Sequence, residues 1–345
     1  MIVLLLFLFI TAIVFCFVPI KENSSAFLIL SIIGFSCILL LSFRGEHVDN
    51  DYESYKEIFN RQGFELGVEP TFLLIKYLVS TFLNNQFIFL IITYAVLGVT
   101  LKFYGIIRLS EFWFFSLLIY LSNVFLIQDM TQIRAGVCSS ILLLSLILLK
   151  NKNHFGFFLL AIAGCLFHFS GLIIFFFWFL DPEKLNRKVW ALLIPLCYLA
   201  FLSHANLSNF SKLIPIPTVQ AKLNVYFTLQ ESAKATKVNV FSALIALRII
   251  LAYLLLYKID VLSVKNQYAI LALKVYLLSI GVIIIAADIS ALAFRLNELL
   301  SISELVAVPL LIHLFKPKIV GELLVVLFAI ILVFVHYRSH TLTIF

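Results

Sequence analysis

Long apolar runs alternate with short polar linkers from one end of the chain to the other. A helix of roughly 20 apolar residues crosses the hydrocarbon core of a bilayer, because its backbone groups bond within the segment. The runs show no strand-like alternation, so they predict an all-α fold: a polytopic transmembrane helix bundle of about 11–13 spans. Residues 1–345 then form a single integral membrane domain, with spans at about 2–20, 26–43, 86–107, 112–128, 135–149, 155–167, 171–181, 189–204, 240–257, 268–287, 296–315 and 319–337.

Three stretches need a separate interpretation. Residues 70–84 carry Lys76, so they predict either a further span or an amphipathic helix in the membrane interface. The apolar run over 155–180 is interrupted by His168-Phe-Ser-Gly171, and we predict two short helices that meet at this break. The first twenty residues lack a basic start and a small-residue cleavage site, which favours an uncleaved first span over a signal peptide.

Composition agrees with a membrane protein and excludes several other classes. The chain is 63% hydrophobic and 12% charged with 36 Phe, which a soluble domain does not tolerate. Its five cysteines lie in apolar runs at unrelated spacings, which is typical of small core residues and of neither a disulfide framework nor a metal site. We attribute the net charge of +7 to membrane topology and expect no nucleic-acid partner.

Charge along the chain predicts which loops share a side. Short loops rich in Lys and Arg lie in the cytoplasm. One alternating topology places all the short basic linkers there, provided that 155–180 is a hairpin and 70–84 does not cross. The exterior then receives an outer loop at 44–69 (extending to 84), the turn at 128–134, the break at His168, a second outer loop at 204–239 and the turn at 288–295. Every polar cluster that is a candidate for function therefore faces the exterior.

The first outer loop predicts a short amphipathic helix. Asp51 can cap it, and Tyr52, Tyr55, Ile58 and Phe59 share one face that lies on the membrane or against the bundle. Pro then occupies a tolerated first position of the next helix, after Glu69. Aromatic rings beside carboxylates and amides suit sugar recognition, although aromatic residues also gather at membrane interfaces without any ligand. The candidate sugar contacts are Tyr52, Tyr55, Gln128, Asp129, Gln132 and Tyr226.

Six short motifs follow one another along most of the chain: Phe43-Arg44-Gly45, Asp51-Tyr52 with Tyr55 and Phe59, Glu69-Pro70, Gln132-Ile133-Arg134-Ala135-Gly136, Phe167-His168-Phe169-Ser170-Gly171-Leu172 and Phe294-Arg295-Leu296. In this order they resemble the motifs of the EpsG family of membrane polysaccharide polymerases, which are related to the Wzy O-antigen polymerases. One departure is Ala135, where the family often has Gln. Asp49 is an alternative match for the acidic position, but the tyrosine spacing favours Asp51.

The resemblance implies a glycosyltransferase that works at the outer face of a bacterial inner membrane. It would transfer a growing glycan from undecaprenyl pyrophosphate onto a lipid-linked repeat unit, without a metal or another cofactor. The expected partners are these lipid-linked oligosaccharides and the bilayer. A chain-length regulator is a further candidate partner that the sequence does not decide. Guanidinium groups bind pyrophosphate bidentately and stay charged, which assigns Arg134 and Arg295 to the leaving pyrophosphate. Arg44 either assists them or binds the pyrophosphate of the second lipid.

The acceptor hydroxyl requires a proton acceptor. His168 is the first candidate, because histidine titrates near neutral pH, and Asp51 and Glu69 are the competing carboxylates. Each residue also has a structural alternative: a satisfied core histidine for His168, or an ion pair with Glu46 or Asp51 for Arg44 and with Asp129 for Arg134.

Two other functions stay open. A lipid-linked polysaccharide transporter or flippase is disfavoured, because the polar groups gather on one side and no internal repeat is visible. An O-antigen ligase would use the same donor and the same arginine chemistry, and only the resemblance favours a polymerase over it.

Overall fold

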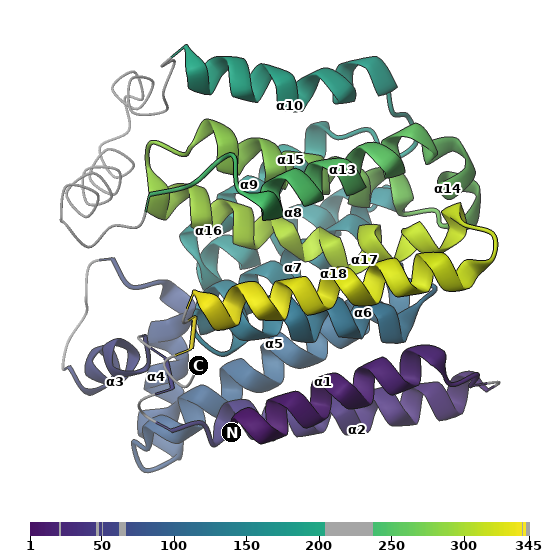
Figure 1. Ribbon diagram of the computed structural model, residues 1–345. Helices are drawn as coiled ribbons and strands as arrows, with labels where there is room; N and C mark the ends of the chain where they lie inside the picture. The colour runs from purple at the N-terminus through teal and green to yellow at the C-terminus, as the bar shows by residue number, and fades with distance from the viewer. Residues whose placement is uncertain are drawn as a thin grey trace. The chain divides into compact units, whose positions relative to one another are not determined.

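The computed structural model describes residues 1–20, 22–45, 48–49, 51–61, 67–203, 237–339 and 341–342. Within these residues every regular element is a helix, which confirms the all-α prediction (Figure 1). Contacts divide the chain into two compact units, residues 1–180 with 304–345 and residues 181–303, and each is described by itself.

The first unit holds the N-terminal half of the chain and its C-terminal helix. Its elements are α1 (Ile2–Phe17), α2 (Asn23–Ser42), α3 (Tyr52–Asn60), α4 (Pro70–Phe82), α5 (Phe87–Leu109), α6 (Trp113–Ile119), the π-helix η1 (Tyr120–Asp129), α7 (Ile133–Lys150), α8 (His154–Phe167), η2 (Phe169–Leu172), α9 (Ile173–Phe176), η3 (Phe177–Phe179), α17 (Glu304–Ala307), η5 (Val308–Leu314) and α18 (Lys318–Arg338). The second unit contains α10 (Arg187–Leu202), α13 (Ala243–Tyr257), α14 (Ile259–Lys265), α15 (Ala269–Ile285), α16 (Ser290–Leu300) and η4 (Ser301–Ser303).

Five helical stretches of the described residues are long and apolar enough to cross a membrane: Asn23–Ser42, Phe87–Leu109, Ile133–Lys150, Ser290–Leu314 and Lys318–Arg338. Shorter apolar helices, such as α1, α8 and α15, accompany them. This confirms a polytopic helical membrane protein, while the number of crossings stays a prediction.

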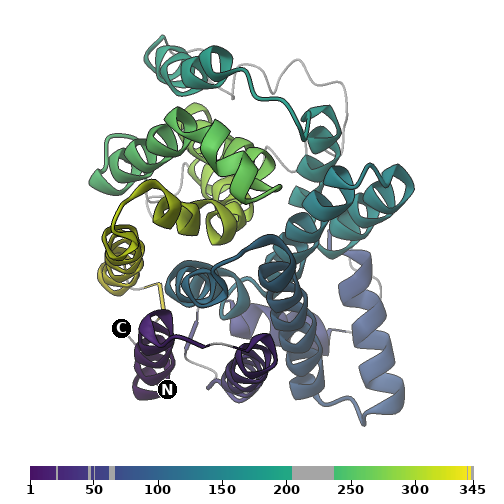
Figure 2. The ribbon, with the colours of Figure 1, turned by 90° about the vertical axis from the view of Figure 1, so that its right-hand side faces the viewer.

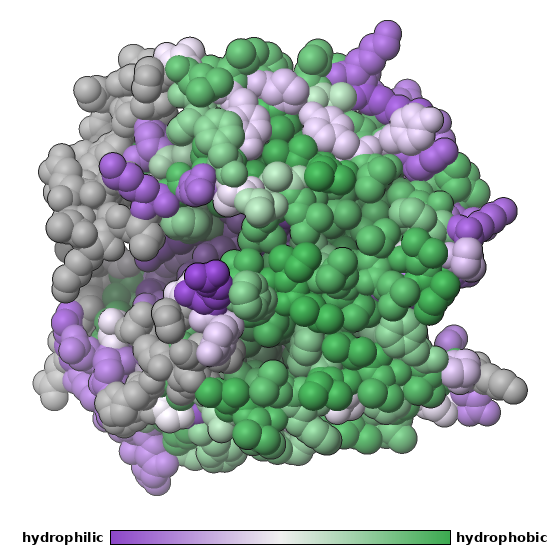
Figure 3. All heavy atoms as spheres, viewed as in Figure 1, coloured by the Kyte–Doolittle hydropathy of each residue, from purple (hydrophilic) through white to green (hydrophobic). Residues whose placement is uncertain are grey.

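Helices at the surface of the first unit present apolar side chains outward. Phe7 and Ile10 of α1 are exposed, as are Leu327 and Phe334 of α18. Figure 2 views α1 and α18 nearly end-on, and hydrophobic side chains cover much of the face drawn in Figure 3. Lipid acyl chains are the environment that such surfaces require, since water would leave them without a favourable contact.

The predicted break at His168 is confirmed. Helix α8 ends at Phe167, and His168 itself has an extended backbone, with φ −155° and ψ 136°. The chain then turns back through η2, with Gly171 against the backbone of Gly164, where an added Cβ would lie 2.5 Å from the carbonyl carbon. A glycine at this position lets the two arms of the hairpin approach closely.

The amphipathic helix of the first outer loop also forms, and it packs against the bundle. Tyr52, Tyr55 and Phe59 of α3 are buried. The rings of Tyr52 and Phe59 contact Phe87 at the start of α5, with centroids 5.3 and 5.5 Å apart. Lys76 of α4 donates a hydrogen bond of 2.8 Å to the carbonyl oxygen of Ile58, near the C-terminal end of α3, where a cation is favoured.

The cap of α3 differs from the prediction. Helix α3 begins after Asp51 as expected, but the Asp51 side chain makes no capping hydrogen bond. Instead, Asp49 Oδ1 accepts from the backbone N–H groups of Asp51 and Tyr52 at 2.9 and 2.8 Å. Its Oδ2 accepts from Arg44 Nε at 2.9 Å, and both side chains are fully buried. Asp49 therefore takes the place predicted for Asp51 beside Arg44 and reaches the helix start and the guanidinium at once, while the other predicted partner, Glu46, lies outside the described residues.

We expect Asp49→Ala to destabilise the first unit strongly. The change removes the cap of α3 and leaves the Arg44 charge buried without a carboxylate, which costs about 3–5 kcal/mol for a buried pair. Asp51→Ala is the matched control and should cost less than about 1 kcal/mol, since Asp51 supplies no cap. Thermal unfolding in detergent measures both, and equal losses would contradict this account of the cap.

Candidate functional site

Three segments that lie far apart in the sequence meet at Glu69. Its Oε2 forms an ion pair with Nη1 of Arg134, and its Oε1 lies 2.8 Å from Nδ1 of His168. The predicted pairing of Arg134 with Asp129 is therefore wrong. The contacts bring together the residue before α4, the start of α7 and the helix break at His168, which the charge pattern had predicted only to share one side of the membrane.

Local structure places Glu69 beside His168. Glu69 directly precedes α4, and its carbonyl oxygen accepts from the N–H of Phe72 at 3.0 Å, while Pro70 occupies the first helical position. The hydroxyl of Thr71 donates to the carbonyl oxygen of Leu166 at 2.8 Å, near the end of α8. This bond joins the start of α4 to the end of α8, so the Glu69 and His168 side chains extend from neighbouring helix ends.

Arg134 lies in the first turn of α7, and aromatic rings support its guanidinium. The Cζ atom lies 5.2 Å from the ring centroid of Tyr55 and 5.6 Å from that of Phe72. Such contacts favour a cation over the ring face and restrict the planar group to one orientation. The Arg134 and His168 side chains are 20% and 14% exposed, so both can reach a ligand from outside the bundle.

Glu69 is held as a carboxylate. Burial opposes its charge, but the hydrogen bond from His168 and the charge of Arg134 prevail and lower the pKa of Glu69 to about 2. An ionised carboxylate only accepts hydrogen bonds, so Nδ1 of His168 carries the proton in this contact. In neutral His168 the other ring nitrogen, Nε2, is then the proton acceptor.

We expect the Glu69 contacts to add stability above pH 4.5 that is lost on acidification. The pKa falls from 4.5 to about 2 on folding, so the gain is complete above the unfolded value and disappears as the pH falls toward 2. Its full size is about 3 kcal/mol, from about 1.4 kcal/mol per pKa unit. Thermal unfolding of the wild type and of Glu69→Gln between pH 7 and pH 2.5 measures it. The two stabilities should converge in acid, and a constant difference would contradict the assignment.

A second arginine lies at the end of α2, against the same face of α3. Arg44 Cζ is 5.6 Å from the ring centroid of Tyr52, one helical turn from the Tyr55 ring that supports Arg134. Asp49 binds only its Nε, and in the described part of the chain the buried Nη1 and Nη2 atoms have no hydrogen-bond partner. Tyr52 and Tyr55 are thus buried supports for two guanidinium groups.

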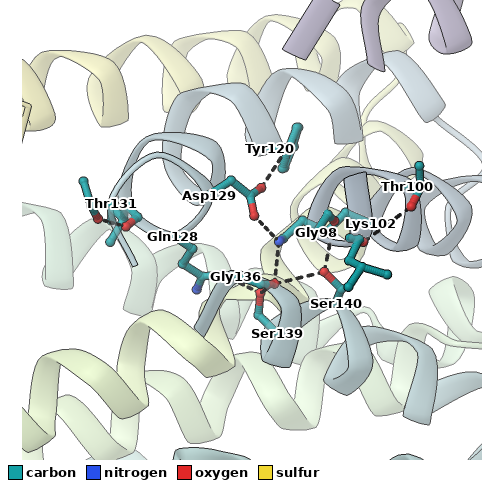
Figure 4. A network of polar contacts seen from close by, with 12 residues as sticks. Gly98, Thr100, Lys102, Tyr120, Gln128, Asp129, Thr131, Gly136, Ser139 and Ser140 are labelled. Atoms are coloured by element: carbon teal, nitrogen blue, oxygen red, sulfur yellow. Dashed lines mark hydrogen bonds and ion pairs between the residues drawn. The ribbon is translucent and has the colours of Figure 1, made fainter. Parts of the chain in front are cut away.

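Gln128 and Asp129 lie inside the bundle (Figure 4). Asp129 Oδ1 accepts from Lys102 Nζ at 2.7 Å, Oδ2 accepts from the Tyr120 hydroxyl at 2.7 Å, and the Gln128 side chain accepts from Ser139. The sequence interpretation did not include Lys102. A lone lysine in an apolar span could have revealed it, because such residues pair inside the bundle or act at a site.

The other predicted site residues lie elsewhere. Gln132 is half-exposed, directly before α7 and near Arg134 in sequence. Arg295 is exposed on α16 of the second unit, whereas Arg44 and Arg134 belong to the first. Asp51 is half-exposed and precedes α3, and Tyr226 lies outside the described residues. Among residues whose positions are described, no group of three or more His, Cys, Asp or Glu side chains could hold a metal ion.

Comparison with known families adds one finding to this geometry. The EpsG family pattern matches residues 27–344, nearly the whole chain. The chain belongs to the EpsG family. Members of the EpsG family are Wzy-type, polymerase-like membrane proteins. Membership therefore suggests that the chain is a membrane enzyme of the glycosyltransferase kind. No curated protein and no solved structure matches the chain.

Proposed function

We propose that this EpsG-family chain is a metal-independent polysaccharide polymerase. It transfers a growing glycan from undecaprenyl pyrophosphate onto the terminal hydroxyl of a second lipid-linked repeat unit. The observation that carries the proposal is the contact of Arg134, Glu69 and His168 from three separate segments. These residues supply a fixed cation, a carboxylate and an imidazole, which are the groups that such a transfer requires.

Arg134 is the proposed ligand of the leaving pyrophosphate. As the bond between the anomeric carbon and the pyrophosphate oxygen breaks, negative charge grows on that oxygen, and a preorganised guanidinium stabilises it more than water would. Glu69 engages Nη1, while Tyr55 and Phe72 hold the plane of the group. The first free N–H groups of α7 add a positive field at the same helix end.

His168 is the proposed general base. The acceptor hydroxyl attacks the anomeric carbon, the pyrophosphate leaves with the bonding electrons, and Nε2 of His168 takes the hydroxyl proton. Glu69 accepts from Nδ1–H, which leaves Nε2 as the proton acceptor of the neutral ring and stabilises the imidazolium that forms, as a carboxylate does for histidine in hydrolase triads. Because the pKa of Glu69 is about 2, its carboxylate is a poor base itself and is assigned a positioning role.

Arg44 is the proposed second anion ligand, because donor and acceptor both carry a pyrophosphate. Its Nη1 and Nη2 atoms are buried without hydrogen-bond partners among the described residues, while Asp49 fixes Nε. An oxyanion would satisfy both donors. Arg295 stays a proposed pyrophosphate ligand on the strength of its motif.

The remaining assignments concern sugars and location. Gln132, half-exposed beside Arg134, is the proposed sugar contact within the turn, whereas the bonding of Gln128 and Asp129 favours a structural role. Tyr226 of the second outer loop stays a proposed sugar contact. We place the site at the exterior face of the bacterial inner membrane, since the basic linkers gather on the other side of the predicted topology.

A gene deletion in the native host, complemented with wild type or variants, tests the function. Surface polysaccharide length is read on a gel, and each variant is checked for membrane expression. A polymerase predicts single repeat units in the deletion strain and in well-expressed Arg134→Ala and His168→Ala strains.

Two other outcomes would replace the proposal. Long chains that remain on undecaprenyl pyrophosphate in the deletion strain would identify a ligase, because polymerisation would be intact and only transfer would be lost. An unchanged ladder in every strain would exclude polysaccharide assembly and would favour a transporter of another substrate.

A further inference from the structure

Lys102 of α5 joins both sides of the connection that leads into α7. Its Nζ donates to Asp129 Oδ1 at 2.7 Å and to the carbonyl oxygen of Gly136 at 2.6 Å (Figure 4). Asp129 is the last residue of η1, and Gly136 lies in the first turn of α7. Arg134 lies between these two anchored positions, so one buried ammonium group holds the backbone on both sides of it.

Two glycines leave just enough space for the Asp129 carboxylate between α5 and α7. A Cβ atom added to Gly136 would lie 2.6 Å from Asp129 Oδ1, and one added to Gly98 would lie 2.9 Å from the same oxygen. Only glycines allow α5 and α7 to approach the carboxylate this closely. The Gly136 carbonyl also accepts from the hydroxyl groups of Ser139 and Ser140, at 2.9 Å each.

Hydrogen bonds to both carboxylate oxygens of Asp129 distinguish this pair from a buried charge with a single contact. Asp129 Oδ2 accepts from the Tyr120 hydroxyl at 2.7 Å, and the Lys102 side chain is fully buried. A fully satisfied buried network favours one geometry, because any displacement leaves a charge or a donor unpaired in a low-dielectric interior. Displacement of Asp129 or Gly136 would move the helix start that carries Arg134.

We propose that Lys102 and Asp129 are positioning residues, which set the place of Arg134 through a buried ion pair seated on Gly98 and Gly136. This inference rests on the proposed role of Arg134 in the transfer. It also gives a physical reason for Gly136 in the Gln132–Gly136 motif, because the missing side chain leaves room for the carboxylate that orders the turn.

The test compares Lys102→Met, Asp129→Asn and the double variant with a matched control. Lys274→Met removes another buried lysine that donates to two carbonyl oxygens, those of Asp181 and Lys184, but in the second unit. Hydrogen exchange of the purified proteins in detergent is measured over residues 130–136. The rate of chain extension is measured in membranes of the complemented strain.

We expect faster exchange over 130–136 in the Lys102 and Asp129 variants and no change there in Lys274→Met. Chain extension should fall by about 100-fold, the scale of an ångström-size misplacement of a reacting group. On an Arg134→Lys background, where the guanidinium is already absent, the double variant should lower the rate by less than about 2-fold, since coupled residues are not additive.

Two results would overturn the positioning role. One is unchanged hydrogen exchange over 130–136 in the double variant. The other is a rate loss on introducing the double variant that is equal with and without the Arg134 guanidinium. If single variants do not fold, the double variant removes both charges together, and Gly136→Ala displaces the carboxylate with both charges present. Gly105→Ala of α5, which meets the flexible Leu143 side chain, is its control. Normal extension by Arg134→Ala would refute the proposed function of Arg134, and the exchange data would still decide the positioning.

Discussion

Arg134→Ala is expected to stop chain extension, with a rate loss of at least about 10²–10³-fold, the usual effect of removing one group that stabilises developing charge. The guanidinium is the proposed ligand of the pyrophosphate, and its loss leaves Glu69 with one partner fewer in a mostly buried position. Arg134→Lys should rescue little, because a lysine ammonium cannot keep the ion pair and the flat contacts with Tyr55 and Phe72 together. Polysaccharide length and extension rate in membranes measure both variants.

The matched control is Arg61→Ala. Arg61 pairs with Glu57 on the exposed side of α3, where both side chains are more than half exposed, at 59% and 68%. Such a pair contributes about 0–1 kcal/mol, so chain length should not change. Normal chains in a well-expressed Arg134→Ala strain would remove Arg134 from the site.

His168→Ala is expected to lower the rate by about 10²–10⁴-fold, the usual contribution of a positioned general base. His168→Asn is the sharper variant, because its amide can still donate to Glu69 but cannot take the acceptor proton. The rate of His168→Asn should therefore be as low as that of His168→Ala, because the hydrogen bond to Glu69 does not replace the missing base. Extension rates of the wild type and of both variants in membranes measure the loss.

His154→Ala is the control for this prediction. His154 begins α8, at the opposite end from His168, and its ring lies 4.5 Å from that of Trp178, between centroids. The rate should stay within about 2-fold of wild type, since this histidine contacts none of the proposed reacting groups. A wild-type rate in His168→Asn would exclude His168 as the base and return that role to a carboxylate.

Hydrophobic patterning determined the class of this protein and the ends of most helices. Runs of apolar residues select helices in lipid, and polar interruptions such as His168 end them, since both effects act locally along the chain. Charge bias among the linkers predicted one common side for the segments of Glu69, Arg134 and His168, and the structure shows that these residues contact each other. The ordered motifs pointed to the EpsG family, which the family pattern then showed.

Pairing within the site was decided only by tertiary structure. Asp49 instead of Asp51 caps α3, and Glu69 instead of Asp129 binds Arg134, because the partner of a buried charge depends on which side chains packing brings within hydrogen-bond reach. Lys102 is a further example of a buried charge whose partner only packing decides. Its sequence neighbours are apolar, and its carboxylate partner comes from a segment 27 residues away. Sequence thus determined which residues are polar within the membrane protein, and three-dimensional packing determined which of them bind each other.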